Sequence, residues 1–163
     1  LLLLDEPLAS LDRARRIELN IELARLLREL EQTAVYVTHD QDEAFSLADD
    51  VGVMHQGQVL RVGSPGDVWR DPQFEIVARF VGHEAMIERD GQRFAVRPDA
   101  VSIATSGELV GRVKTCAFQG DRYALTIDVD GGPWRLFHSV AVEPGSMVRL
   151  SLDPTRLARI TDI

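Results

Sequence analysis

Hydrophobic and polar positions predict alternating strands and helices over the first half of the chain. Residues 1–4 are all leucine and predict a buried strand, and residues 34–38 predict a second, compact strand. Between them, leucines recur at intervals of four, three and four residues, which predicts a helix over residues 13–31. Its main apolar stripe consists of Leu19, Leu23, Leu26 and Leu30, with Ile17, Ile21 and Ala24 on a second face. Two apolar faces indicate that this helix packs on both sides.

After residue 38, residues that are typical of helix ends and turns indicate the next elements. Asp40, with Glu43 three residues later, matches a capping box and predicts a helix to about residue 48. Apolar residues at 51–54 and 58–62 predict a hairpin that turns at residues 55–57. The remaining helical signals are the Ser64-Pro65 pair and an apolar stripe of Phe74, Val77, Ala78 and Val81.

From about residue 86 the pattern changes to short strands separated by Gly, Pro and Asp, which is typical of a small β-barrel or sandwich. Predicted strands lie at residues 109–118, 123–129, 134–137 and 148–152. Gly131-Gly132 supplies one of the tight turns between them. The change of pattern places a junction at Gly82–Ala85. The predicted fold is therefore an α/β part followed by a small all-β part.

Composition and charge exclude several classes of protein. The 163 residues carry 18 basic and 26 acidic side chains, a formal net charge of -8, which argues against a general nucleic-acid binder. The single cysteine, Cys116, excludes an internal disulfide. No apolar run approaches the roughly 20 residues that a membrane-spanning helix needs. Residue 1 is Leu and lies inside a predicted strand, so we expect the chain to be the C-terminal portion of a longer protein.

Three side chains with the chemistry of a phosphate site follow the two predicted strands. Asp5 and Glu6 come directly after the leucine run, and His39 ends the second strand. Ligands bind at the carboxyl edge of open α/β sheets, so these side chains stand where a ligand would lie. The first acid suits Mg²⁺, which takes few protein oxygens and keeps several waters. The second acid can orient or deprotonate a water, and the histidine can contact a terminal phosphate.

These residues stand in motifs that resemble those of ABC transporter ATPase subunits. Residues 1–7 (Leu-Leu-Leu-Leu-Asp-Glu-Pro) are similar to the Walker B motif, and residues 10–12 (Ser-Leu-Asp) to the D-loop. Residues 38–40 (Thr-His-Asp) are similar to the switch-histidine motif. The resemblance covers residues 1–82 and implies part of a P-loop NTPase-type ATPase domain.

The resemblance also implies a role for each matching residue. Asp5 would be the Mg²⁺-associated acid, holding the ion through water, and Glu6 the catalytic carboxylate that polarises the attacking water. His39 would contact the γ-phosphate of ATP. Ser10 and Asp12 would communicate across the interface between two copies of the subunit.

Residues 83–163 resemble the OB-like, TOBE-type accessory domain that follows the ATPase domain in many importer subunits. The matching segments are Arg97-Pro98-Asp99, Gly111-Arg112-Val113, Phe118-Gln119-Gly120 and Leu152-Asp153-Pro154. The resemblance implies the ATP-hydrolysing subunit of a bacterial or archaeal ABC importer, which couples ATP binding and hydrolysis to solute uptake. Its partners would be a second copy of the subunit and transmembrane permease subunits at the cytoplasmic face of the cell membrane, with no nucleic acid.

The chain departs from the family in two motifs. It has neither a Gly-rich phosphate loop nor a Leu-Ser-Gly-Gly-Gln-type signature, and its one lysine is Lys114. A phosphate loop cradles phosphates with its backbone N–H groups and its lysine. We therefore predict that the chain alone neither binds ATP tightly nor hydrolyses it. The alternative hypothesis is a binding or regulatory module in which residues 86–163 sense a small ligand such as an oxyanion.

Overall fold

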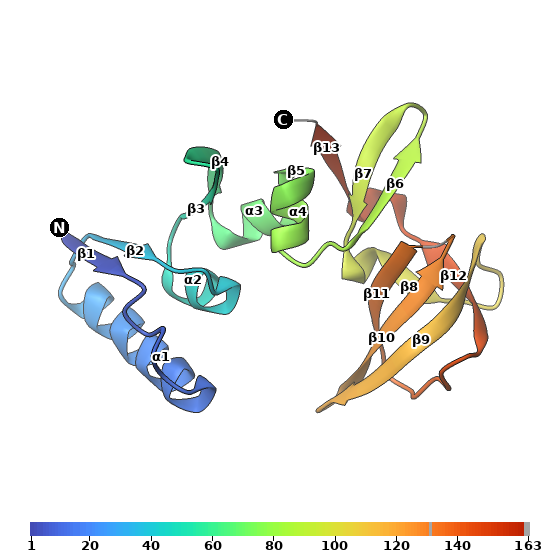
Figure 1. Ribbon diagram of the computed structural model, residues 1–163, viewed down its shortest axis with the longest axis horizontal. Coiled ribbons are helices and arrows are strands. Elements are labelled where there is room, and N and C mark those ends of the chain that lie inside the picture. The colour runs from blue at the N-terminus through green and yellow to red at the C-terminus, as the bar shows by residue number, and fades with distance from the viewer. Residues whose placement is uncertain (131, 162–163) are drawn as a thin grey trace. The chain divides into compact units, whose positions relative to one another are not determined.

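Figure 1 shows the computed structural model, which describes residues 1–130 and 132–161. Over these residues the chain is mostly β, with several helices concentrated in its first half. It divides into two compact units, Leu1–Trp69 and Arg70–Ile163. None of the helices among these residues combines the length and apolar character of a membrane span.

The first unit opens with a strand–helix–strand arrangement. Strand β1 (Leu2–Asp5) is followed by helix α1 (Arg13–Glu29) and strand β2 (Ala34–Val37). The two strands pair in parallel, and their register places Asp5 opposite Val37. Parallel pairing brings the carboxyl ends of both strands to the same edge, as the sequence predicted.

Helix α1 packs through a different face from the predicted leucine stripe. Its buried residues are Asn20 and Ala24, which face helix α2 (Gln41–Leu47). The described residues do not cover the leucine stripe, since Leu19, Leu26 and Leu30 are all exposed. The helix also ends at Glu29 rather than Glu31, whose left-handed backbone (φ 50°) breaks the helical repeat.

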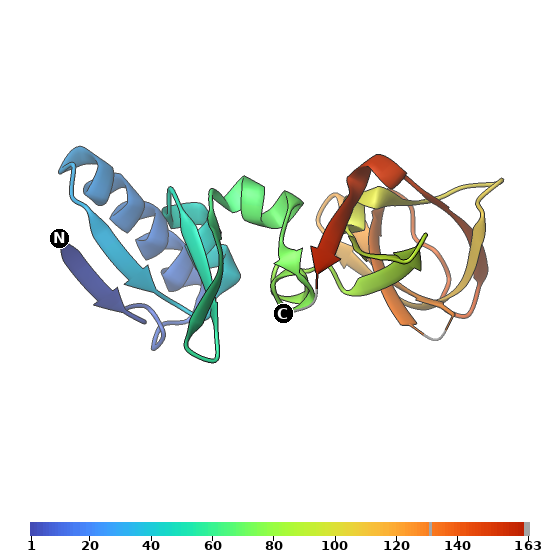
Figure 2. The same cartoon turned by 90° about the horizontal axis from the view of Figure 1, so that it is seen from above.

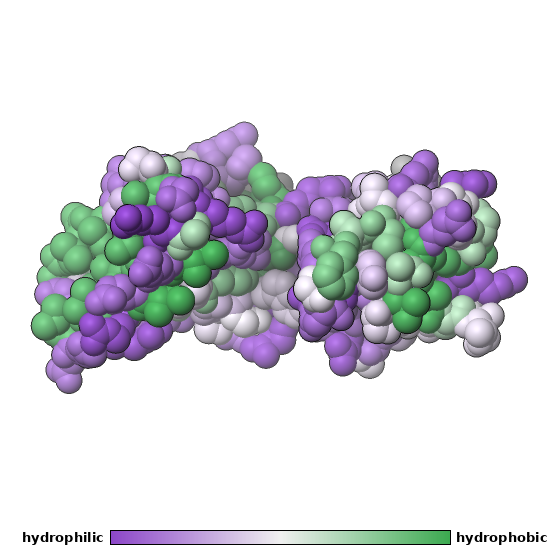
Figure 3. All heavy atoms as spheres, turned by 90° about the horizontal axis from the view of Figure 1, so that it is seen from below, coloured by the Kyte–Doolittle hydropathy of each residue, from purple (hydrophilic) through white to green (hydrophobic). Residues whose placement is uncertain are grey.

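The leucine strand is also more exposed than predicted. Leu1 is 79 % and Leu3 71 % exposed, and Val35 and Val37 of β2 are exposed as well. The sheet that they form has two strands, and side chains project from the faces of a sheet, so these leucines and valines lie on a face that the described residues leave uncovered. Figure 3 shows apolar (green) areas on the surface of the first unit.

Local signals correctly predicted the rest of this unit. Strands β3 (Val51–His55) and β4 (Gln58–Gly63) form an antiparallel hairpin. Both turn residues, Gln56 (φ 48°) and Gly57 (φ 79°), are left-handed, which is the backbone of the tight two-residue turn. Helix α3 (Pro65–Arg70) follows, and the hydroxyl of Ser64 accepts a hydrogen bond of 3.2 Å from the backbone N–H of Asp67.

In its described residues the second unit has two sheets, one α-helix and two short 3₁₀ helices (Pro98–Ala100 and Pro154–Arg156), and Figure 2 shows it from above. Its elements are β5 (Gln73–Phe74), α4 (Glu75–Phe80), β6 (Ala85–Arg89), β7 (Gln92–Val96), β8 (Val101–Ile103), β9 (Leu109–Gln119), β10 (Arg122–Val129), β11 (Gly132–His138), β12 (Met147–Leu152) and β13 (Leu157–Thr161). One sheet has the strand order β11-β10-β9-β12-β8 and the other β5-β13-β7-β6.

The core of this unit lies on the inner faces of its long strands. Its most buried large side chains include Leu125, Ile127, Leu136 and Leu150, all fully shielded from water. Leu125 and Ile127 are two residues apart on β10, as expected for one face of a strand. All four strands predicted here are present, although β9 to β12 each differ from the predicted bounds by one to three residues. The predicted Gly131-Gly132 turn involves Gly131, which lies outside the described residues.

The first compact unit ends at Trp69, before the predicted junction at Gly82–Ala85. Strand β5 pairs with β13, with Gln73 opposite Ile160. Ala78 of α4 is fully buried in one cluster with Ala95, Ala158 and Ile160. These contacts join residues that are distant in sequence, so the local pattern alone does not show them.

Candidate active site

The carboxyl ends of β1 and β2 bring two predicted site residues together. The backbone N–H of Glu6 donates to the carbonyl of Val37 at 2.9 Å, so residue 6 stays tied to the end of β2. Beyond this bond, Glu6 Oε1 and His39 Nδ1 lie 3.0 Å apart. Glu6 has a left-handed backbone (φ 44°), which is rare for a residue with a side chain and interrupts the alternation of the strand.

The Glu6–His39 pair is open to solvent and electrostatically coupled. The side chains are 44 % and 74 % exposed, so a ligand can reach both. The hydrogen bond that His39 donates to the Glu6 carboxylate, together with the negative charge of Glu6, raises the pKa of His39 above its ordinary value. Because Nδ1 faces Glu6, the other ring nitrogen, Nε2, is left for a ligand.

Replacing Glu6 with glutamine is expected to lower the pKa of His39 toward about 6.5, because the negative charge of Glu6 that raises this pKa is lost. A histidine whose pKa is raised by folding stabilises the fold below about pH 6.5, and this contribution disappears as pH rises through the folded-state pKa. NMR titration of the imidazole measures the shift. Glu29→Gln, on the exposed face of α1, is the control and should leave the pKa of His39 unchanged. An unaltered pKa in Glu6→Gln would mean that the pair does not form.

Asp5 supplies a single carboxylate at the same edge. The residue is exposed, ends β1, and makes no side-chain hydrogen bond or ion pair within the described residues. No group of three or more His, Cys, Asp or Glu side chains in residues 1–130 and 132–161 could enclose a metal ion. One free carboxylate fits Mg²⁺, which needs few protein ligands, and does not fit an ion held by an all-protein cage.

The loop between β1 and α1 holds the other two predicted residues. Asp12 accepts a hydrogen bond of 3.1 Å from the backbone N–H of Arg15 and thus caps α1. Ser10 is exposed. No hydrogen bond or ion pair of the described residues joins the side chain of Ser10 or Asp12 to Glu6 or His39. The structure therefore brings together Glu6 and His39, with Asp5 adjacent along the chain.

Glu43 has a different position from the predicted capping box. Asp40 does cap α2, accepting from the backbone N–H groups of Asp42 at 2.9 Å and Glu43 at 3.3 Å. The carboxylate of Glu43, however, is buried and accepts from the hydroxyls of Tyr36 (2.9 Å) and Thr38 (2.8 Å). Burial, and then the bond to Glu43, raise the pKa of Tyr36. Glu43 thus fixes the end of β2, directly before His39, to α2.

Arg16 is the residue near the site that sequence reasoning missed. Its Nη2 donates to the carbonyl of Leu11 at 2.9 Å, and its Nη1 to Asp40 Oδ2 at 3.2 Å. A signal was present in the sequence, because α1 begins with Arg13, Arg15 and Arg16 and has no acid in its first turn. Cations there oppose the helix dipole, which points to partners elsewhere in the fold.

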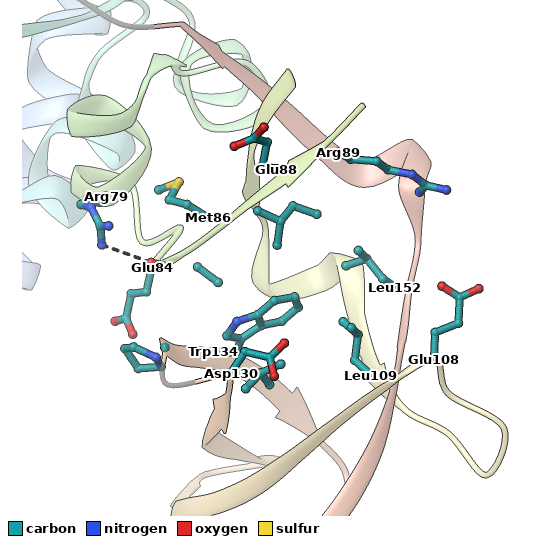
Figure 4. A pocket seen from close by; sticks show the side chains of 15 residues that line it. Arg79, Glu84, Met86, Glu88, Arg89, Glu108, Leu109, Asp130, Trp134 and Leu152 are labelled. Carbon is teal, nitrogen blue, oxygen red and sulfur yellow. Dashed lines mark hydrogen bonds between the residues drawn. The ribbon is translucent and has the colours of Figure 1, made fainter. Parts of the chain in front are cut away.

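The second unit contains a pocket of about 600 Å³ (Figure 4). Figure 4 shows the indole of Trp134, which is 6 % exposed, among its lining side chains. The charged residues of the lining are Glu84, Glu88, Glu108, Asp130, Arg79 and Arg89. Arg79 is already engaged by Glu75, at 2.8 Å, and by the carbonyl of Glu84, at 3.1 Å. Carboxylates outnumber guanidinium groups, so this lining repels anions and does not support the oxyanion-sensing hypothesis.

Comparison with known proteins supports the resemblance on both parts of the chain. Residues 94–160 match the TOBE domain family. The chain is 34 % identical to a spermidine/putrescine import ATP-binding protein of Acetivibrio thermocellus, over 94 % of this chain and 51 % of the relative. It is 37 % identical to an Fe(3+) ions import ATP-binding protein of Streptomyces avermitilis, over 94 % of this chain and 52 % of that protein.

A third relative gives the same coverage. A spermidine/putrescine import ATP-binding protein of Clostridioides difficile is 32 % identical over 94 % of this chain and 52 % of its own length. The chain thus spans about half the length of the curated relatives that it matches, and the matched region is their C-terminal half. The chain is therefore similar to the C-terminal half of the ATP-binding subunits of ABC importers.

Proposed function

We propose that residues 1–82 form the carboxyl-terminal part of an ATPase domain and that residues 83–163 form its OB-like accessory domain. The observation that carries the proposal is the pairing of Glu6 with His39, at 3.0 Å, where two parallel strands end. The exposed apolar side chains of β1 and β2 agree with an ATPase sheet that continues in a longer protein. The relatives, all named import ATP-binding proteins, supply the activity class.

The geometry is consistent with a separate task for each member of the pair. Glu6 presents one carboxylate oxygen to His39 and keeps the other for the attacking water, whose proton it accepts as general base. His39 donates a hydrogen bond from Nε2 to the γ-phosphate, while Nδ1 remains held by Glu6. The pair therefore aligns water and phosphate by position, the main source of rate in phosphoryl transfer.

Asp5 is the residue that would hold Mg²⁺, through the ion's water shell. When bound, the ion supplies positive charge that offsets the phosphate oxygens. Asp5 fits this task because its carboxylate is exposed at the strand end next to Glu6.

The relatives' names extend the proposal to partners. We propose that this subunit works with transmembrane permease subunits at the cytoplasmic face of the cell membrane and that ATP binds between two copies of it. Ser10 is exposed in the loop before α1, where it can face the second copy, while Asp12 holds the end of that loop through its cap. The named solutes of the relatives differ: some names give polyamines and another gives Fe(3+). We therefore propose that the protein couples ATP hydrolysis to solute uptake, and we assign no particular solute.

The 163-residue chain alone is expected to show no ATP turnover above that of its own Glu6→Gln variant. The sequence contains no phosphate loop to hold the triphosphate against Glu6 and His39. Phosphate release is measured for both proteins after identical purification, so that any contaminating ATPase contributes equally. Turnover that is present in the chain and lost in Glu6→Gln would contradict the requirement for a phosphate loop.

A further inference from the structure

We infer that Arg16 is a positioning residue, whose guanidinium holds the loop that starts at Glu6 against the turn that carries His39. The inference rests on the proposed function only for its effect on hydrolysis. The contacts of Arg16 that support it all lie within the first unit. Nothing in the sequence motifs assigns Arg16 a role, because it lies outside all three of them.

The contacts of Arg16 span the two segments that form the pair. Nη2 donates to the carbonyl of Leu11, at 2.9 Å, in the loop before α1. Nη1 donates to the carboxylate of Asp40, at 3.2 Å, the residue next to His39. A planar guanidinium directs both donors in a fixed geometry, so one side chain sets the relative position of the two segments.

The position of Leu11 also restrains Glu6, because hydrogen bonds within the loop from Glu6 to Leu11 hold that loop in a compact fold. The backbone N–H of Ala9 donates to the carbonyl of Glu6 at 3.2 Å, and that of Leu11 to the carbonyl of Leu8 at 3.1 Å. Leu8, between these turns, is buried. Holding the carbonyl of Leu11 therefore restrains the short path back to Glu6.

Asp40, the other partner of Arg16, is also held in place. Asp40 caps α2, and the side chain of Asn20 donates to the hydroxyl of Ser46 at 2.6 Å, which ties α1 to α2 one helical turn beyond Arg16. Burial alone would raise the pKa of Asp40, but the N–H groups of Glu43 and Asp42 and the Arg16 guanidinium lower it. Asp40 thus stays ionised and paired with Arg16.

A role in charge compensation alone is the competing explanation. Arg16 Nε lies 3.5 Å from Glu43 Oε1, so the guanidinium also balances a buried carboxylate. The charged groups around His39 are Glu6, Asp40 and Glu43, with Arg16 behind the latter two. If charge alone mattered, removing the cation would raise the pKa of His39. If position matters, the Glu6–His39 pair loosens and the pKa of His39 falls.

The test is an NMR titration of His39 in the 163-residue chain and in Arg16→Lys. Lysine keeps the charge beside Glu43 but lacks the planar fork that reaches Leu11 and Asp40 together. We expect the pKa of His39 in Arg16→Lys to lose about half or more of its elevation above about 6.5. Faster hydrogen exchange at the N–H of Leu11 should accompany the shift. Arg25→Lys is the matched control, because Arg25 lies on the same helix and pairs only with exposed Glu22 and Glu29.

Arg16→Lys separates the two explanations because it keeps the positive charge. Positioning predicts a lower pKa of His39 in this variant. Charge compensation predicts an unchanged pKa, and that result overturns the inference. The titration needs no ATP turnover, so its failure is distinct from a failure of the proposed hydrolysis, which variants of Glu6 test separately.

Discussion

Glu6→Gln in the longer protein that carries this chain is expected to lower ATP turnover by about a hundredfold or more, within the range of about 10²–10⁴ for a general base. Glutamine keeps the size of the side chain and a hydrogen bond to His39 but cannot accept the proton of the attacking water. ATP binding should be retained, because the carboxylate acts on water rather than on the nucleotide. Steady-state phosphate release and equilibrium ATP binding are measured on the same preparation.

Two further variants separate chemistry from folding. His39→Ala should also reduce turnover, with the protein still folded, because the side chain is exposed and its loss leaves no buried cavity. Glu22→Gln removes an equally exposed carboxylate from α1 and should leave turnover unchanged. Full turnover in Glu6→Gln would show that Glu6 is not the general base.

Leu125→Ala is expected to destabilise the second unit by about 2–5 kcal/mol. Leu125 is completely buried and lies in register between Cys116 of β9 and Leu136 of β11. Its truncation removes apolar contacts on both sides and leaves a cavity between paired strands. Urea unfolding followed by the fluorescence of Trp134, in a Trp69→Phe background, measures the change in this unit.

Val140→Ala provides the control for this prediction. Val140 is 62 % exposed, so its truncation should change the free energy of unfolding by less than about 0.5 kcal/mol. Equal losses in the two variants would mean that β10 does not carry the core of the second unit.

Elements defined by local chemistry could be predicted from the sequence. The caps at Asp12 and Ser64 depend on bonds to a backbone N–H only three residues away. The hairpin turn at Gln56-Gly57 depends on a residue that tolerates a left-handed backbone. In β10 the apolar residues Tyr123, Leu125, Ile127 and Val129 recur at every second position, so the pattern predicts both the strand and its inward side.

Features that depend on distant residues could not be predicted in this way. The sequence pattern of α1 favours its leucines as the packing face, whereas the helix meets α2 through Asn20 and Ala24, because bonds to Ser46 and Glu43 determine the contact. Glu43 fits a cap by spacing, but the hydroxyls of Tyr36 and Thr38 compete for its carboxylate. The site residues also divide into those that local sequence indicates and those that depend on distant contacts. Strand-end motifs indicate Glu6 and His39, and only the folded chain reveals Arg16.

The most direct test of the account is a crystal structure of the longer protein, as its Glu6→Gln variant, with Mg²⁺ and ATP. The account predicts that the γ-phosphate lies within about 3 Å of His39 Nε2, with the side chain of residue 6 facing the water in line with that phosphate. A γ-phosphate bound away from the ends of β1 and β2, with His39 directed elsewhere, would contradict it.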